Sequence, residues 1–170
     1  MRNLLVLLCL AFGGCAGTIP RPYQVETPKP LPVALDRDFE IRKTGQYFLD
    51  PAPKPITGQI DQSVTFERGY RMYGAVTAVD QHQRFGNYFD FFWRARRSAD
   101  VRVRLEYRQE KLHALVQARE VHYLHARGNH KTEFAIAGDD FFDDGRVIAW
   151  RASLIVDGRV AAVTRSYLWE

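Results

Sequence analysis

The dipeptide Asp157-Gly158 limits most strongly what this chain can fold into, because it separates two runs rich in apolar and β-branched residues. The runs at 147–156 and 160–169 are each long enough for a strand. Asp-Gly is a preferred pair for a type I′ turn, in which both central residues need a positive φ. The chain is therefore predicted to end in a β-hairpin whose last strand pairs almost to the C-terminus.

Two earlier stretches, 88–96 and 101–108, alternate apolar and polar residues with the period of a strand. A turn at 98–100 is expected to join them. The aromatic face of the first stretch is expected at the centre of the core, and the second stretch has one buried and one solvated face. The predicted buried residues are Phe89, Phe91, Trp93 and Ala95 in the first strand, and Val101, Val103, Leu105 and Tyr107 in the second.

The remaining elements follow from propensity and turn residues. From residue 61 onward the pattern has period two: Val64 and Phe66 alternate with polar residues, and aromatic and β-branched residues predict a strand over 70–77. The stretch 112–124 is predicted as a strand from Val116, Val121 and Tyr123, although its Ala, Leu, Gln and Glu residues leave a helix as the alternative. Further predictions are a loop at 79–87, a loop at 126–130, a strand at 132–137 and an acidic loop at 138–145.

Seven or eight such strands, with no parallel-crossover pattern, predict an all-β fold, namely an antiparallel β-sandwich. In strand count and in its mid-strand Trp93, the region 88–169 resembles immunoglobulin and fibronectin type III domains. It lacks the paired cysteines of antibody domains. A β-barrel is the main alternative.

All eight prolines lie between Pro20 and Pro55, so the chain divides into two parts. Clustered prolines favour extended chain over packed structure. We therefore expect a Pro-rich tether at 15–57 and a β-sandwich domain at 58–170. Within the tether, Phe39 and Ile41 alternate with charged residues, so 38–48 is either an added edge strand or a spacer.

The first residues have the organisation of an export signal. Arg2 provides a positive charge, residues 4–12 are apolar, and Gly13-Gly14 precede Cys15. This resembles the signal peptide of bacterial lipoproteins, which would make 1–14 the signal and Cys15 the acylated, palmitate-bearing first mature residue. The usual leucine three positions before the cysteine is Phe12 here. Plain secretion and an uncleaved anchor are the alternatives, and the apolar run is short for a span.

The resemblance implies a cell-envelope location, and Ala16 after the cysteine implies sorting to the outer membrane. Cys9 would leave with the signal and Cys15 would carry lipid, so no disulfide is expected in the mature protein. The hydrophobic fraction of 46% is sufficient for a packed core without one. No cofactor is implied, and an exported protein is not expected to meet nucleic acid.

Three groups of residues have side chains suited to binding sites. Outward arginines of the two predicted strands could form a basic face for an anionic ligand: Arg94, Arg96, Arg102 and Arg104. The acidic loop carries a weak calcium candidate: Asp139, Asp140, Asp143 and Asp144. His122 and His125 would point to opposite faces of a strand, so zinc is disfavoured and no metal site is predicted.

No motif for a catalytic nucleophile, a metalloprotease or a P-loop is present. We therefore expect a non-enzymatic lipoprotein, held in the membrane by its N-terminal lipid, that acts as a binding or adaptor module for a protein or envelope glycan. The alternative is a structural envelope protein that contacts peptidoglycan or lipopolysaccharide through the basic face.

Overall fold

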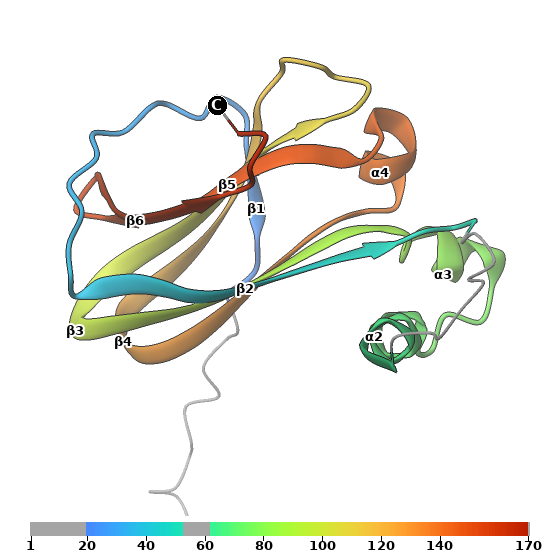
Figure 1. Ribbon diagram of the computed structural model, residues 1–170, viewed down its shortest axis with the longest axis horizontal. Coiled ribbons are helices and arrows are strands. Elements are labelled where there is room, and N and C mark those ends of the chain that lie inside the picture. Colours follow the sequence, from blue (N-terminus) through green and yellow to red (C-terminus); the bar gives the residue numbers. More distant parts are fainter. Residues whose placement is uncertain (1–19, 53–61, 170) are drawn as a thin grey trace, which may run out of the picture.

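The computed structural model describes residues 20–52 and 62–169, which form a mostly antiparallel β-fold around one six-stranded sheet (Figure 1). An all-β fold is thereby confirmed. The strands are β1 (Tyr23–Val25), β2 (Phe39–Leu49), β3 (Gly86–Gln109), β4 (Gln117–Ala137), β5 (Val147–Val156) and β6 (Arg159–Arg165). The helices are α2 (Gln62–Met72), α3 (Ala78–His82) and α4 (Asp139–Asp144).

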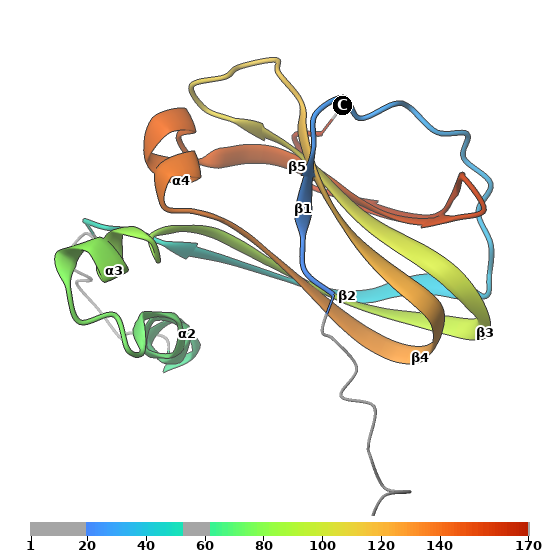
Figure 2. The same ribbon diagram turned by 180° about the vertical axis from the view of Figure 1, so that it is seen from behind.

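The long strands β3 and β4 pair with each other over nearly their whole length and form the backbone of the sheet. On its other edge, β3 pairs with β2 through residues 86–95 and with β5 through residues 101–109. The sheet thus has two halves that share one bent ribbon, and Figures 1 and 2 show that ribbon curving between them.

The core lies between these two halves. All eight side chains predicted to be buried on β3 are at most 1% exposed, so the predicted core faces are confirmed. Trp150 of β5 contacts Phe89 and Phe91 of the other half, at ring-centroid distances of 5.8 and 5.6 Å. Contacts between large aromatic side chains therefore hold the two halves together.

The turns predicted at 98–100 and 126–130 are wrong. Both stretches lie inside continuous strands and face each other at the bend, where the pairing shifts register between Ala95 and Val101. His125 (φ 50°) and Gly128 (φ 90°) provide the positive backbone angles there. Polar and glycine residues resemble turn signals at this place, but they form an irregularity that bends a two-stranded ribbon.

The strand predicted at 70–77 and the strand-like alternation before it are also wrong, because α2 covers Gln62–Met72 and residues 73–77 form a turn and irregular backbone before α3. Its aromatic residues recur at Phe66, Tyr70 and Tyr73, which is helical spacing, and Glu67 pairs with Arg71 one turn later. The loop predicted at 79–87 contains α3, which begins with a capping box between Thr77 and Asp80. The acidic loop at 138–145 is the short helix α4, flanked by glycines.

The predicted hairpin is confirmed, with φ of 49° at Asp157 and 73° at Gly158 between β5 and β6. Its last strand, predicted to run to Trp169, ends at Arg165. Beyond it, the Trp169 N–H donates to the Ser166 carbonyl in a turn. Trp169 is buried under the side chains of Arg108 and Arg151, so the chain end packs onto the domain.

More of the N-terminal segment pairs with the strands of the domain than the sequence predicts. Of the two alternatives for 38–48, the added edge strand is the one that forms, as β2. In the stretch expected to be tether, β1 pairs with β4, and Ala34 N–H donates to the Val160 carbonyl at 3.0 Å. Pro32 accepts from Val160 N–H through its carbonyl, which proline retains. The strand expected at 112–124 is confirmed from Gln117 onward, and its helical alternative is wrong.

Candidate functional site

Helix α2 has the opposite orientation to an ordinary surface helix, because a charged side chain faces the sheet and aromatic side chains face solvent. Its charged side chain Arg71 is only 6% exposed and faces the sheet. Phe66, Tyr70 and Tyr73, hereafter the aromatic stripe, are 69%, 65% and 86% exposed. An amphipathic helix normally buries its apolar face against the core. Here ionic contacts attach the helix, and its aromatic side chains are left on the surface.

The aromatic stripe continues along the chain into further exposed apolar residues. Phe66 and Tyr70 stack on each other, with 6.3 Å between ring centroids. Val76, just before α3, and Val79, within α3, are 84% and 71% exposed. Contiguous exposed apolar side chains of this kind mark interaction surfaces more often than single exposed residues do.

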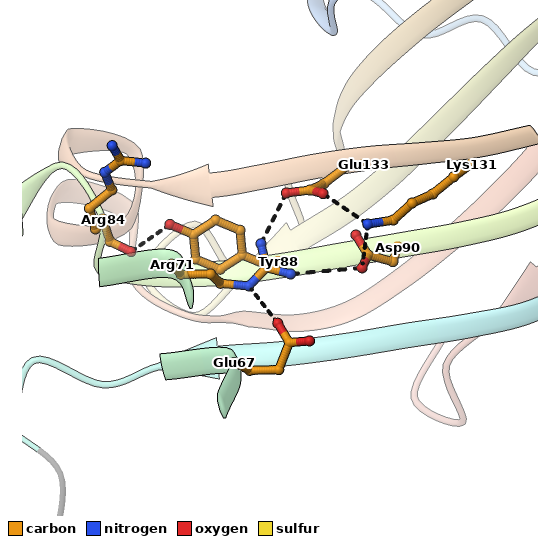
Figure 3. A network of polar contacts seen from close by, with 7 residues as sticks. All are labelled: Glu67, Arg71, Arg84, Tyr88, Asp90, Lys131 and Glu133. Atoms are coloured by element: carbon orange, nitrogen blue, oxygen red, sulfur yellow. Dashed lines mark hydrogen bonds and ion pairs between the residues drawn. The ribbon is translucent and has the colours of Figure 1, made fainter. Parts of the chain in front are cut away.

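An ionic network holds α2 in this orientation (Figure 3), with Arg71 and Asp90 buried and Glu133 and Lys131 partly exposed. The Arg71 guanidinium lies 3.0 Å from Glu133, 3.8 Å from Asp90 and 3.3 Å from Glu67. Lys131 Nζ contacts the same two sheet carboxylates, at 3.0 Å from Asp90 and 3.2 Å from Glu133. Two cations thus share two carboxylates, and one of the cations comes from the helix.

Aromatic rings enclose the guanidinium of Arg71. Its carbon lies 4.1 Å from the centre of the Tyr88 ring and 5.0 Å from that of Tyr47. Tyr88 is fixed in turn, because its hydroxyl donates to the Arg84 carbonyl at 2.6 Å. Desolvated cation–π contacts of this type add to the attraction of the carboxylates. Burial raises the pKa of Tyr88, so this ring stays neutral.

The two shared carboxylates have pKa values shifted in opposite directions. Burial raises the pKa of Asp90 above its ordinary value, and the hydrogen bond from Lys131 only partly opposes this. Burial also pushes the pKa of Glu133 upward, but hydrogen bonds from Lys131 and Arg71 outweigh it and hold that pKa below its ordinary value. The two groups therefore affect stability with opposite signs.

We expect Glu133→Gln and Asp90→Asn to change the pH dependence of stability in opposite directions. A lowered pKa means that Glu133 contributes stability above its ordinary value of 4.5, and that this contribution is lost as the pH falls. For Asp90, whose pKa is raised, the contribution is greatest in acid and decreases as the pH rises through its ordinary value of 3.8.

Urea unfolding at several pH values would measure this. The stability lost between about pH 5 and about pH 3 should be smaller in Glu133→Gln than in the parent protein, and larger in Asp90→Asn. Equal acid losses in all three proteins would show that the two carboxylates are not coupled to folding in this way.

The four arginines predicted as a basic face do not form a ladder across two strands. They follow one another along β3, on either side of the bend. Arg94 is exposed, and Arg96 donates to Glu40 at 3.2 Å. Arg102 lies 3.7 Å from Glu120, and Arg104 is 7% exposed and donates to Glu120 at 2.6 Å. Arg94 and Arg96 are therefore the exposed pair, whereas Arg102 is partly exposed and Arg104 is buried.

Two of the four acidic residues of α4 contact basic side chains from other elements. Asp139 lies 3.0 Å from His82, and Asp140 accepts from Arg119. Asp144 accepts from Gln117 at 3.3 Å, and Asp143 is exposed. Within residues 20–52 and 62–169, no three His, Cys, Asp or Glu side chains come together as a metal-binding group. Phe141 and Phe142 are half-buried against Phe48 and His82.

The histidines gather at the bend of the ribbon. His122, His125 and His130 line a shallow hollow of about 520 Å³ together with Leu124, Arg127 and Pro20. His130 stacks on Trp93, with 4.4 Å between ring centroids. Pro20 is the first residue that the structure describes, so the N-terminal end of the described chain lies at the bend. Cys15 and the signal at 1–14 lie outside the described residues.

Sequence reasoning missed both the ionic network and the aromatic stripe. The signal for the stripe was the spacing of Phe66, Tyr70 and Tyr73, which fits a helix better than a strand. The network had a local sign only in the pair Glu67 and Arg71. Its sheet members lie far away in the sequence.

No protein-family model, curated protein or solved structure matches this chain. Among the described residues, no helix is both long and apolar enough to cross a membrane.

Proposed function

We propose that this protein is a bacterial envelope lipoprotein, anchored through acylated Cys15, that acts as a non-catalytic adaptor. The observation that carries the adaptor role is the exposed aromatic stripe of α2, fixed to the sheet by Arg71. The anchor and the outer-membrane location rest on the sequence around Cys15 and on Ala16.

The stripe suits a protein partner that offers an apolar groove. Aromatic residues at helical spacing are the usual anchors when a helix docks into such a groove. Because the ionic network fixes the helix before binding, little conformational entropy is lost on association. The partner is expected to be another envelope protein, since a lipid anchor restricts the module to that compartment.

A structural envelope protein is the second candidate, with peptidoglycan or lipopolysaccharide as its ligand. Exposed Arg94 and Arg96 favour it, because arginine binds anionic oxygens well. The two candidates differ in salt dependence: contact through arginines weakens as ionic strength rises, whereas an apolar interface does not.

We further propose that the curved sheet corresponds to the immunoglobulin-like sandwich expected from the sequence. Support comes from its two halves, which face each other across a single aromatic core. In this arrangement the shared β3–β4 ribbon takes the place of separate strands in two sheets.

Site-specific photocrosslinking in the native cells tests the adaptor role. A photoreactive residue replaces Tyr73 in the stripe, and Tyr167, which is 99% exposed, serves as the matched control position. We expect one dominant protein adduct from position 73 and none from position 167. The adduct should disappear in Phe66→Ser/Tyr70→Ser and in Cys15→Ala, which lacks the anchor.

The controls separate the candidates. If both positions give the same products, or if the stripe variant keeps the adduct, the adaptor proposal fails. Recovery of only glycan or lipopolysaccharide, lost at high salt, would favour the structural role and direct attention to Arg94 and Arg96.

A further inference from the structure

The place where the described chain begins limits how the domain can sit on a membrane. Five residue steps separate Cys15 from Pro20, so an extended chain spans at most about 18 Å between them. If Cys15 is acylated, as proposed above, its lipid lies in the bilayer and Pro20 lies within that reach of the surface. Pro20 shares a hollow with Leu124 and Arg127, so the bend of the ribbon is close to the membrane as well.

The bend has the side chains that an anionic bilayer attracts. We name as the basic bend Arg94, Arg96 and Arg97 of β3 with Leu124 and Arg127 of β4. Leu124 is 67% exposed, and the four arginines are exposed too. Exposed arginines and an exposed leucine at one bend fit the headgroup region, where guanidinium groups meet phosphates and an apolar side chain enters the acyl boundary.

Acidic residues neutralise only part of this surface. Arg97 pairs with Asp36 at 3.0 Å and with Asp38 at 3.5 Å, and Arg96 pairs with Glu40. Asp100 lies 3.5 Å from His125. Arg94 and Arg127 have no ion-pair partner in the part of the chain that the structure describes. Both charges remain available for an anionic surface.

We propose that the basic bend is a membrane-docking surface that lies on anionic phospholipid headgroups, so that the domain has one fixed orientation on the bilayer. This inference rests on the proposed anchor at Cys15. The anchor keeps the bend close to the bilayer and so raises the effective concentration of headgroups around it. A few weak contacts are then sufficient to keep the domain bound to the bilayer surface. Each basic residue near an anionic bilayer adds roughly fivefold in affinity.

This orientation leaves the aromatic stripe clear of the bilayer. In Figures 1 and 2 the bend of β3 and β4 lies at one end of the long axis, and α2 lies at the other. One end would therefore face lipid while the other faces a partner, as an adaptor requires.

Fluorescence quenching from the lipid phase tests the docking surface. The acylated protein is reconstituted into vesicles of phosphatidylcholine, with or without phosphatidylglycerol, that contain a nitroxide-labelled lipid. A fluorophore is attached at Asn129→Cys in the bend, or at Ala114→Cys in the loop between β3 and β4, which lies on the opposite side (Figure 1). Both positions are exposed.

We expect strong quenching at position 129 and little at position 114, only in vesicles with phosphatidylglycerol, and loss of the difference at high salt. Arg94→Gln/Arg127→Gln should weaken the preference for phosphatidylglycerol by roughly 25-fold, the product of two fivefold effects. Arg165→Gln, which removes an exposed arginine of β6, should leave it unchanged.

Equal quenching at the two positions, or quenching at 129 that ignores phosphatidylglycerol and salt, overturns the docking surface. The intact mass of the same sample reports acylation of Cys15 separately. A protein without lipid defeats the proposed function, and this inference with it. An acylated protein without selective quenching defeats this inference alone.

Discussion

Replacing Trp93 with alanine should lower the free energy of unfolding by about 4 kcal/mol, because a large buried ring is lost from the centre of the core. Trp93 is 1% exposed and packs against both Tyr123 and His130, at 5.2 and 4.4 Å between ring centroids. The indole N–H also donates to the Thr132 hydroxyl at 2.9 Å. Urea unfolding monitored by circular dichroism would measure the change.

Trp93→Phe separates the packing contribution from the hydrogen bond. Phenylalanine keeps most of the ring volume and loses the N–H, so its cost should be about 1–2 kcal/mol. Tyr167→Ala, which removes a fully exposed ring, should change stability by less than about 0.5 kcal/mol. If Trp93→Ala costs no more than Trp93→Phe, the ring is not a central packing element.

Arg71→Met should lower the free energy of unfolding by about 3 kcal/mol and release α2 from the sheet. Methionine keeps the length of the side chain but removes the charge, which leaves Glu67 without its cation and Asp90 and Glu133 with Lys131 alone. Breaking a buried ion pair by removing one partner typically costs about 3–5 kcal/mol. We choose the lower end because Lys131 still neutralises the sheet carboxylates.

Arg68→Met is the matched control, since Arg68 lies on the same helix and donates only to the Asp50 carbonyl among the described contacts. Its cost should be about 1 kcal/mol or less. Hydrogen exchange should show faster exchange of the α2 amides in Arg71→Met and near-parent rates in Arg68→Met. Similar costs in the two variants would mean that the ionic network does not hold the helix.

Local sequence patterns predicted the parts of the fold that depend on neighbouring residues. Alternation along 88–96 and 101–108 identified the buried face of β3, because strand geometry alone sends alternate side chains to opposite sides. Asp157-Gly158 identified the hairpin for an equally local reason, the positive φ that both residues adopt.

Long-range pairing decided the parts that the sequence did not predict. Residues 98–100 and residues 126–130 each resemble a turn when considered alone. They form a bend because they lie opposite each other in the paired strands β3 and β4. In α2 the β-propensity of Val64, Phe66 and Tyr70 favoured a strand, but propensity is a weak guide where ionic contacts to a distant sheet fix the conformation.

The candidate site also combines features that depend on neighbouring residues with features that depend on long-range contacts. The lipidation prediction for Cys15 uses adjacent residues, whereas the ionic network gathers Arg71, Asp90 and Glu133 from α2, β3 and β4. No spacing in the sequence relates these three positions. The exposure of the aromatic stripe likewise follows from which face of α2 the network holds against the sheet.

The pairing of residues 32–36 with β6 has a consequence for the order of folding. Val33, Ala34 and Asp36 contact Val160 and Ala161, so one of the first described segments pairs with the last strand. Contacts between residues far apart in the sequence slow folding, because a large loop must close before they form. The ribosome synthesises residues 32–36 before the hairpin of β5 and β6. In a nascent chain, residues 32–36 therefore cannot reach their native pairing until β6 has been synthesised.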